Sequence, residues 1–191
     1  MSTLALANIR GIASTGNVIT IPTGHRLIST DTGGIYIPGS ITQTYQAVKT
    51  DTFSATPNGT WTSVTGLSIS IVPRKTSSQI LIFMNLIIGG NGTTPKARLL
   101  RNGVPIALGN AGPANQQLAT FGTFLSYDGN QAFPGSAIFL DSPATTGSQT
   151  YQLQINNDNA TVLYVNRGAT DAASATGGRY ISSITVMEVA V

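Results

Sequence analysis

Short strand patterns separated by turn signals run along most of this chain, and they constrain its fold more than any other feature. The stretch GLSISIV (66–72) alternates apolar and polar residues, which is the period of a half-buried strand. The run QILIFMNLII (79–88) is almost continuously apolar and lies between turn residues, which predicts a strand buried on both faces. In ARLLRNGVPIALG (97–109), Asn102 and Gly103 suit the two positive-φ positions of a type I′ turn, so this stretch predicts a β-hairpin.

Seven further stretches have strand character, and no helical pattern lies between them. They are residues 48–53, 61–65, 117–127, 137–140, 150–155, 162–165 and 180–189. About ten short strands without helices predict an all-β fold, an antiparallel sandwich or a barrel. The residues expected in its core are Leu67, Ile69, Ile71, Ile80, Ile82, Phe83, Leu99, Leu125, Phe139, Leu153, Ile155 and Val186.

The first part of the chain has too few apolar residues to bury a core of its own. Pro22 and Gly24 interrupt its alternating stretch, which restricts it to an edge or stem strand. We therefore expect an extended N-terminal arm, residues 1–46, and a β-domain, residues 47–191. An extended arm exposes unpaired backbone groups and becomes ordered against other copies or a larger surface. The arm residues expected to make assembly contacts are Leu4, Leu6, Ile9, Ile12, Val18, Ile19, Ile21, Leu27, Ile35, Tyr36 and Ile37.

The chain carries few charges, which limits its possible partners. Charged residues make up 9% of the sequence, against roughly 25% in an ordinary soluble protein. Because little like-charge repulsion keeps copies of the chain apart, we expect the protein to form part of an assembly. The net charge is +3, but no basic run is longer than Arg74-Lys75, so nucleic acid is not an expected partner. The longest apolar run is far short of the ~20 residues of a membrane helix, and polar residues after Met1 do not suggest a secretory signal.

The residues that carry chemistry are scarce. His25 is the only histidine and lies in the arm, and there is no cysteine, so neither a catalytic triad nor a common zinc site is expected. Asp128, Asp141 and Asp158 lie beside turn-forming residues, where their side chains make local hydrogen bonds. The stretch INNDNAT (155–161) offers oxygen ligands for calcium, but an ordinary tight loop is the preferred interpretation. We expect no enzyme, cofactor or metal site; nothing in the sequence favours a polysaccharide-cleaving enzyme.

Two single residues leave alternatives open. Trp61 follows a turn signal, and it either stacks on a sugar or, the favoured interpretation, packs into the core. Glu188 lies in an apolar strand, and a buried carboxylate needs an arginine or a backbone N–H as partner. The alternative is that the last strand faces a subunit boundary with Arg98, Arg101 or Arg179 opposite Glu188.

Several segments together resemble a known family. TDTFSATPNGTWTSVTGLSISIVPRKTSSQILI, ARLLRNGVPIALG, YQLQI, LYVNRGATD and SSITVMEVA follow one another over roughly residues 47–190. In order and spacing they resemble small bacteriophage virion proteins of the tail-fibre-like or structural kind, common in phages of cyanobacteria. The resemblance implies a jelly-roll head, similar to tumour-necrosis-factor or C1q heads. It also implies association as a homotrimer on the exterior of a particle made in the bacterial cytoplasm.

Two roles on a virion fit these expectations. In the first, the protein is a capsid-decorating or cement protein whose arm grips the major capsid protein. In the second, it is a tail-fibre or receptor-binding tip that joins tail proteins and contacts the host surface, including a surface glycan. The arm must provide both anchor and shaft of a fibre, and fully extended it spans at most ~150 Å. Its short reach favours decoration.

Overall fold

The structure, a computed structural model, is all-β in the parts of the chain that it describes. It describes residues 19–29, 35–91, 94–114, 116–123, 129–171, 173 and 177–191. Within these ranges no helix occurs, and eleven strands form two antiparallel sheets. The chain divides into two units, Met1–Ile35 and Tyr36–Val191, and every strand belongs to the second, which we call the sandwich. In the first unit, residues 19–29 are exposed and form no strand.

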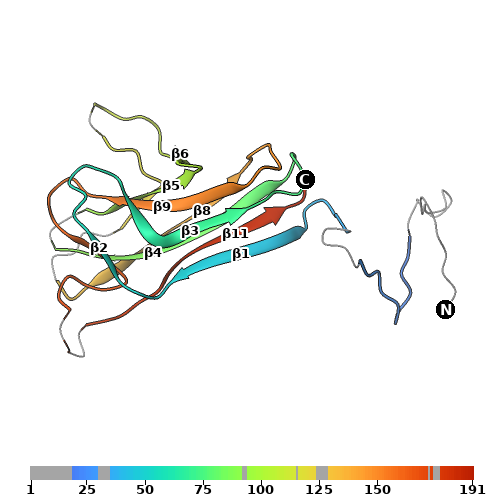
Figure 1. Cartoon of the computed structure of the whole chain (residues 1–191), viewed down its shortest axis with the longest axis horizontal. Helices are drawn as coiled ribbons and strands as arrows, with labels where there is room; N and C mark the ends of the chain where they lie inside the picture. The colour runs from blue at the N-terminus through green and yellow to red at the C-terminus, as the bar shows by residue number, and fades with distance from the viewer. Residues whose placement is uncertain are drawn as a thin grey trace. The chain divides into compact units, whose positions relative to one another are not determined.

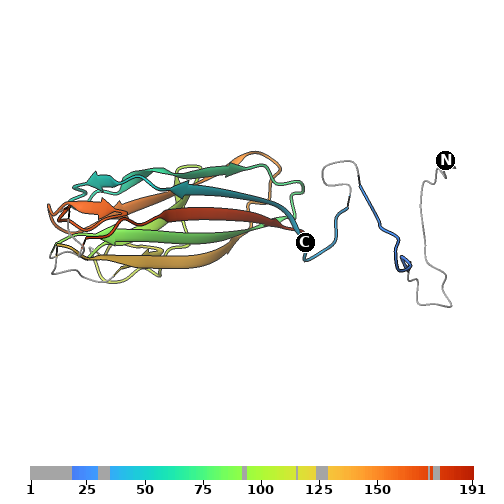
Figure 2. The same cartoon turned by 90° about the horizontal axis from the view of Figure 1, so that it is seen from below.

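Sheet A is built around the long strand β4. Its strands are β1 (Ile41–Lys49), β11 (Ser182–Val189), β4 (Gln79–Gly89), β8 (Ala132–Asp141), β10 (Leu163–Val165) and β2 (Phe53–Ala55). β4 pairs with β11 and with β8, and β1 pairs with β11. At the far end of β4, β10 pairs with its last two residues, and β2 pairs with β10. Figure 2 shows β1, β11, β4 and β8 side by side.

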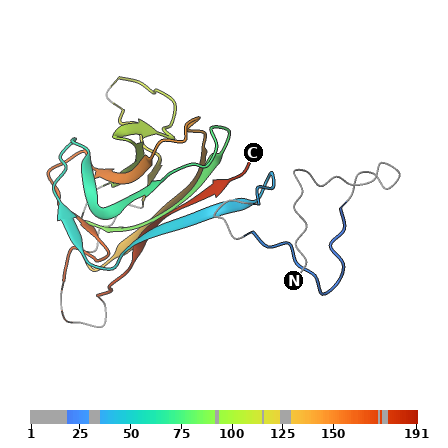
Figure 3. The same cartoon turned by 45° about the vertical axis from the view of Figure 1, so that its right-hand side comes forward.

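Sheet B lies against sheet A as a second layer (Figure 3). Its strands are β3 (Thr62–Ile71), β9 (Gln149–Asn156), β5 (Lys96–Arg101), β6 (Val104–Ile106) and β7 (Phe121–Gly122). The order is β3-β9-β5, and both β6 and β7 pair with β5. The long strands alternate between the sheets along the chain: β1, β4, β8 and β11 belong to sheet A, and β3, β5 and β9 to sheet B. The start of β1 and the C-terminus lie at the same end of the sandwich (Figure 1).

The core lies between the sheets and follows the period of two that the sequence shows. Every second residue of β4, from Ile80 to Ile88, is buried, and Tyr151, Leu153 and Ile155 of β9 are fully buried opposite them. These side chains bring the two sheets together because their apolar surface leaves water. Truncating a buried Leu or Ile of this set to Ala costs about 2–5 kcal/mol of unfolding free energy. The predicted antiparallel sandwich is therefore confirmed.

The predicted hairpin at Asn102-Gly103 is confirmed. Arg101 pairs with Val104, so the turn contains two residues, with φ angles of 50° and 82°. The Asn102 side chain accepts a hydrogen bond from the Thr150 N–H at 2.8 Å, which ties this turn to β9. The turn residues thus set the register of β5 and β6 and also connect them to the neighbouring strand.

Buried polar groups tie the sheets at one end of the sandwich. Asp141, at the end of β8 in sheet A, accepts two hydrogen bonds from Arg101 of β5, at 2.8 and 2.9 Å. The Tyr151 hydroxyl of β9 donates to the same carboxylate at 2.7 Å. Burial, together with this hydrogen bond, raises the pKa of Tyr151 well above its ordinary value. Asp141, predicted as a turn residue, instead links one strand of sheet A to two strands of sheet B.

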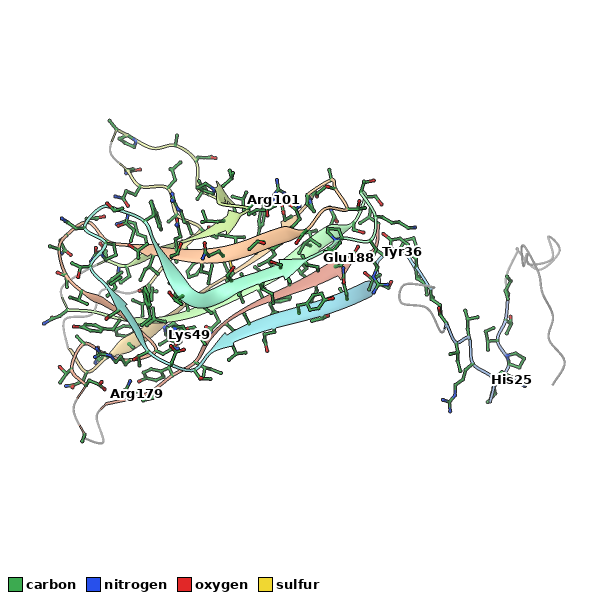
Figure 4. All side chains as sticks on the ribbon, viewed as in Figure 1. His25, Tyr36, Lys49, Arg101, Arg179 and Glu188 are labelled. Carbon is green, nitrogen blue, oxygen red and sulfur yellow. The ribbon has the colours of Figure 1, made fainter. Side chains whose placement is uncertain are left out.

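A second buried hub lies around Asn166, just after β10. Its side-chain amide donates to the backbone carbonyls of Lys49 and Asp51 at 2.8 and 2.9 Å, and its Oδ1 accepts from Ser182 at 2.6 Å. Lys49 is itself buried and pairs with Asp51 at 2.8 Å. Figure 4 shows Lys49 away from the end that carries Glu188 and Tyr36.

The boundaries of three predicted strands differ from the structure. The strand predicted at 48–53 spans the bend between β1 and β2. Only Phe121–Gly122 of the 117–127 prediction forms a strand, β7, and residues 124–128 lie outside the described part. β8 begins five residues before the predicted 137, at Ala132. Pro134, which has no N–H to donate, is tolerated because β8 is an edge strand that pairs with β4 alone among the described residues. Gly135 is required there, since a Cβ would lie 2.7 Å from the Thr123 side chain.

The boundary between arm and β-domain also differs from the prediction at 46/47. The sandwich begins at Tyr36, and residues 41–46 lie in β1, where they pair with β11. The physical reason is that β11 offers a long free edge, which the alternating ITQTYQAVK stretch satisfies. The connecting residues are fixed as well, because the Gly39 N–H donates to the Ala190 carbonyl at 2.7 Å.

Most predicted core residues are buried, and one described residue, Phe83, lies on the outer face of sheet A. Leu67, Ile71, Ile80, Ile82, Leu99, Leu153, Ile155 and Val186 are buried, Ile69 and Phe139 are half-buried and pack against the core, and Leu125 lies outside the described residues. Phe83 was wrongly placed in the core, because 37% of its surface is exposed. β4 is therefore not buried on both faces: its odd-numbered residues point away from sheet B.

Candidate assembly surface

The outer face of sheet A carries adjacent rows of apolar side chains. Register places Leu81 of β4 between Leu140 of β8 and Met187 of β11, on the side of the sheet that points away from the core. The next row places Phe83 beside Ile138. Ile138 is 67% exposed, Leu140 45% and Phe83 37%. We call Leu81, Phe83, Ile138, Leu140 and Met187 the apolar face; β1, β11, β4 and β8 lie side by side beneath it in Figure 2.

The surroundings of the apolar face are uncharged. The following row holds Ser136, Asn85 and Ser183, and beyond it Ile87 lies opposite Pro134. The outward residues of β1 are also uncharged: Thr44, Gln46 and Val48. Across the described strands β1, β11, β4 and β8, no outward position holds a charged side chain. Neither like-charge repulsion nor desolvation of ions therefore opposes the approach of a second apolar surface here.

Several charged residues are paired with one another at the ends and loops of the sandwich. Examples are the pairs Lys49–Asp51, Lys96–Asp158, Arg101–Asp141, Arg179–Asp171 and Arg74–Glu188. Figure 4 shows Lys49 and Arg179 toward one end of the sandwich and Glu188 near the other. Because the chain has few charged residues and these pairs lie elsewhere, the apolar face carries no charged side chain.

Glu188 has partners inside its own chain. Its side chain is fully buried, and its carboxylate accepts hydrogen bonds from the Arg74 N–H at 2.7 Å, Thr42 at 2.9 Å and Gln43 at 2.7 Å. Burial raises the pKa of this carboxyl, but contacts with Ser78 and these donors outweigh it, so the pKa lies below its ordinary value. The predicted backbone N–H partner is confirmed.

The alternative partners predicted for Glu188 lie elsewhere. Arg101 pairs with Asp141, Arg179 pairs with Asp171, and Arg98 donates to Gln154 at 2.8 Å. The arginine nearest Glu188 is Arg74, whose Nε lies 3.8 Å from the carboxylate. Glu188 therefore fixes the 72–78 loop against β11 and does not need a second subunit.

Tyr36, which the sequence assigned to the assembly contacts of the arm, docks on the sandwich. Its hydroxyl accepts a hydrogen bond from the Val191 N–H at 3.1 Å and lies 3.3 Å from the Ser78 hydroxyl. The Lys75 ammonium lies 3.5 Å from the centre of its ring. The contact with Ser78 is the main cause that lowers the pKa of Tyr36. These contacts fix the point at which the chain enters the sandwich, next to the C-terminus.

The other predicted arm contacts are exposed or lie outside the described residues. Leu4, Leu6, Ile9, Ile12 and Val18 are outside. The described ones are exposed: Ile19, Ile21, Leu27, Ile35 and Ile37. Each offers apolar surface to a partner, and their role in assembly stays a prediction.

The residues considered for chemistry lie apart. His25 is exposed in the first unit, and Asp158 pairs with Lys96. Asn157 uses its amide within its own loop, donating to the Thr161 carbonyl at 2.6 Å. Among the described residues, no group of three or more His, Cys, Asp or Glu is arranged to hold a metal ion. The same residues contain no helix long and apolar enough to cross a membrane.

The sequence reasoning missed most of the apolar face. Leu81, Ile138, Leu140 and Met187 were not singled out, although a signal was present. In 79–88 and 137–140 both odd and even positions are apolar, whereas a strand with one solvated face alternates. Such a pattern fits both a strand that its own chain covers on both faces and a strand whose second face is exposed, as it is here.

The chain matches no model of a known protein family, and no curated protein matches it.

Proposed function

We propose that this protein is a structural subunit that associates with copies of itself through the apolar face of sheet A. The observation that carries this proposal is the adjacency of Ile138, Leu140 and Phe83, all exposed, on a sheet face without charge. Exposed apolar surface costs about 25 cal/mol per Å², so its burial against a like surface drives association. A second copy is the favoured occupant because the uncharged face is complementary to itself.

The proposed assembly is a closed homotrimer of jelly-roll heads. The orders β1-β11-β4-β8 within sheet A and β3-β9-β5-β6 within sheet B support a jelly roll, since the long strands alternate between the two sheets along the chain. A rotation axis parallel to the strands brings the apolar faces of three copies together and closes the assembly. Rotation about this axis keeps the strand direction of every copy, so it places all three Tyr36 residues at the same end of the trimer. At this end each chain enters its sandwich, next to its own C-terminus.

In this proposal the N-terminal residues attach the trimer to a larger body. Ile19, Ile21 and Leu27 expose apolar side chains that suit a groove on another protein. Three such segments on one body bind far more tightly than one, provided that they reach their sites together. We propose a bacteriophage particle as this body and capsid decoration as the role, with the major capsid protein as partner. A tail-fibre tip is the second candidate; the polar outer face of sheet B, described below, favours it.

The test of self-association is the molecular mass in solution by light scattering and native mass spectrometry. The wild-type chain is expected to be trimeric, and Ile138→Lys to be monomeric and folded, because three buried ammonium groups cannot be accommodated. Val104→Lys is the matched control: Val104 is 63% exposed on β6 of sheet B and should leave the trimer intact. A monomeric wild type, or equal masses for both variants, contradicts the proposal.

Attachment is tested separately. A chain that begins at Tyr36 should keep the fold and the trimeric state and lose binding to the particle, since residues 36–191 contain every strand that the structure describes. Labelled protein on imaged particles distinguishes the two roles: many threefold capsid positions indicate decoration, and a few copies at the tail indicate a fibre. Binding that survives the truncation contradicts attachment through the N-terminal residues.

A further inference from the structure

The outer face of sheet B is polar and internally hydrogen-bonded, unlike that of sheet A. Arg98 of β5 donates from Nε to the side-chain amide oxygen, Oε1, of Gln154 on β9 at 2.8 Å. The Gln154 amide donates to Ser63 of β3 at 3.2 Å, and the Ser63 hydroxyl donates to Gln152 at 3.3 Å. A line of amide and hydroxyl groups thus crosses three strands, held in place by its own contacts.

Trp61 lies at one end of this line, directly before β3. The Arg98 guanidinium lies 4.4 Å from the centre of the indole ring. Trp61 is half-buried, so part of the ring reaches the surface. The contact fixes indole and guanidinium against each other, which combines an apolar edge with a rigid fork of N–H donors. Neither sequence interpretation of Trp61 included this arginine.

The charge of Arg98 is the feature of this surface that points to an anion. Among the described residues, no carboxylate forms an ion pair with it, and only its Nε–H has a hydrogen-bond partner. Burial lowers the pKa of its guanidinium, and the group stays charged at neutral pH. The Nη atoms are available for a planar anion, which a guanidinium binds through two parallel hydrogen bonds.

A depression of about 430 Å³ adjoins the Trp61–Arg98 pair. Its lining residues are Gly59, Lys96, Gln116, Gln117 and Asp158. Trp61 and Arg98 do not line the depression themselves. Gly59 precedes Trp61 by two residues, and Lys96 precedes Arg98 by two on the same face of β5, which brings the pair next to two of the lining residues. The volume lies within the range of small-ligand sites. The Gln117 amide donates to the Gly59 carbonyl at 3.1 Å, which braces one wall.

We propose that this surface binds an acidic saccharide, with a sugar ring in the depression and its carboxylate on Arg98. A pyranose presents hydroxyls that both donate and accept hydrogen bonds and a C–H face that packs on the apolar surface of an aromatic ring, and the amides, ion pair and indole match these groups. Nucleic acid requires a stripe of cations, whereas Lys96 is neutralised by Asp158. A peptide that adds a strand requires a sheet edge, and this surface is a sheet face.

Direct titration of the full-length protein tests the proposal. The probes are hexasaccharides of galacturonate, of alginate and of hyaluronan, each at low salt, and the methyl ester of the galacturonate probe, which lacks the charge. At least one acidic probe is expected to bind with a dissociation constant below about 1 mM, as few contacts allow. If the galacturonate probe binds, its methyl ester should bind about tenfold more weakly or weaker still. Arg98→Gln should weaken the binding of any acidic probe that binds the wild type by the same factor.

Two further variants separate binding from folding. Trp61→Phe keeps an aromatic ring in place and should weaken binding, by less than Arg98→Gln. Arg179→Gln removes the same charge from the 177–179 region, where the arginine pairs with Asp171, and should bind like wild type. Absence of binding to all three acidic probes, or equal binding by wild type and Arg98→Gln, overturns the proposal. Since sheet A is not touched, the mass of the assembly is expected to be the same in all variants.

Discussion

The outer faces of the two sheets carry different side chains, although both sheets pack on the same core. Both sheets pack apolar residues inward at a period of two, and uncharged residues make up most of both outward faces, although β5 of sheet B presents Lys96 and Arg98 outward. On sheet B, hydroxyl and amide groups such as Ser63 and Gln154 bond to one another and remain suited to water. On sheet A, Phe83 and Ile138 occupy the corresponding central positions. The contrast teaches that low charge alone does not mark an interface; the outward chemistry of each strand does.

The largest expected effect concerns Asp141, which connects the two sheets and so supports both outer faces. Asp141→Ala removes the acceptor that ties β8 to Arg101 and to the fully buried Tyr151. We expect the free energy of unfolding to fall by about 3–5 kcal/mol, because a charge and a hydroxyl lose their buried partner. Urea denaturation measures this change. Asp158→Ala, in an exposed pair with Lys96, is the control and should cost less than about 1 kcal/mol.

The second prediction concerns a variant in which the outer face of sheet A becomes polar, like that of sheet B. Replacing Phe83, Ile138 and Leu140 together by Thr keeps residues that favour strands but removes the exposed apolar surface. We expect association to weaken at least about a hundredfold, which is about 3 kcal/mol. Sedimentation over a range of concentrations measures this. Ser70→Val, an apolar substitution on sheet B, serves as a comparison. If the threonine variant associates like wild type, the apolar face is not the interface.

The third prediction concerns Glu188, at the end of sheet A. Its pKa is below the ordinary value of 4.5, so folding favours the ionised form. The resulting stabilisation is complete above about pH 4.5 and is lost as the pH falls through the lower folded-state pKa. Glu188→Gln should therefore reduce the free energy of unfolding at pH 7 by about 1–3 kcal/mol. The difference from wild type should shrink on acidification below pH 4.5. A difference that grows on acidification contradicts the assignment.

The sequence predicts the parts of this molecule that depend on local patterns. The hairpin at Asn102, the central strand at 79–88 and most of the core follow from turn chemistry and alternation. The start of β1 was missed because its partner residues in β11 lie 139 to 148 residues away in the chain, from Gln46–Thr185 to Ile41–Val189, and no local signal indicates that edge. Phe83 was misplaced because an apolar run has the same pattern whether its second face is covered by its own chain or exposed. The Trp61–Arg98 contact joins two strands separated by β9 and was equally invisible.

The smallest expected effect concerns the hydrogen-bonded ladder of sheet B. Ser70 and Thr150 face each other across β3 and β9, with their hydroxyls 2.8 Å apart. Because the pair is exposed, water replaces a lost partner, so Ser70→Ala should change the free energy of unfolding by no more than about 1 kcal/mol. Its mass in solution should equal that of wild type, in contrast to the threonine variant of sheet A. A double-mutant cycle with Thr150→Val measures the coupling. A coupling energy well above 1 kcal/mol would mean that the hydrogen bonds on the outer face of sheet B contribute to the free energy of unfolding. The two outer faces would then differ in rigidity as well as in polarity.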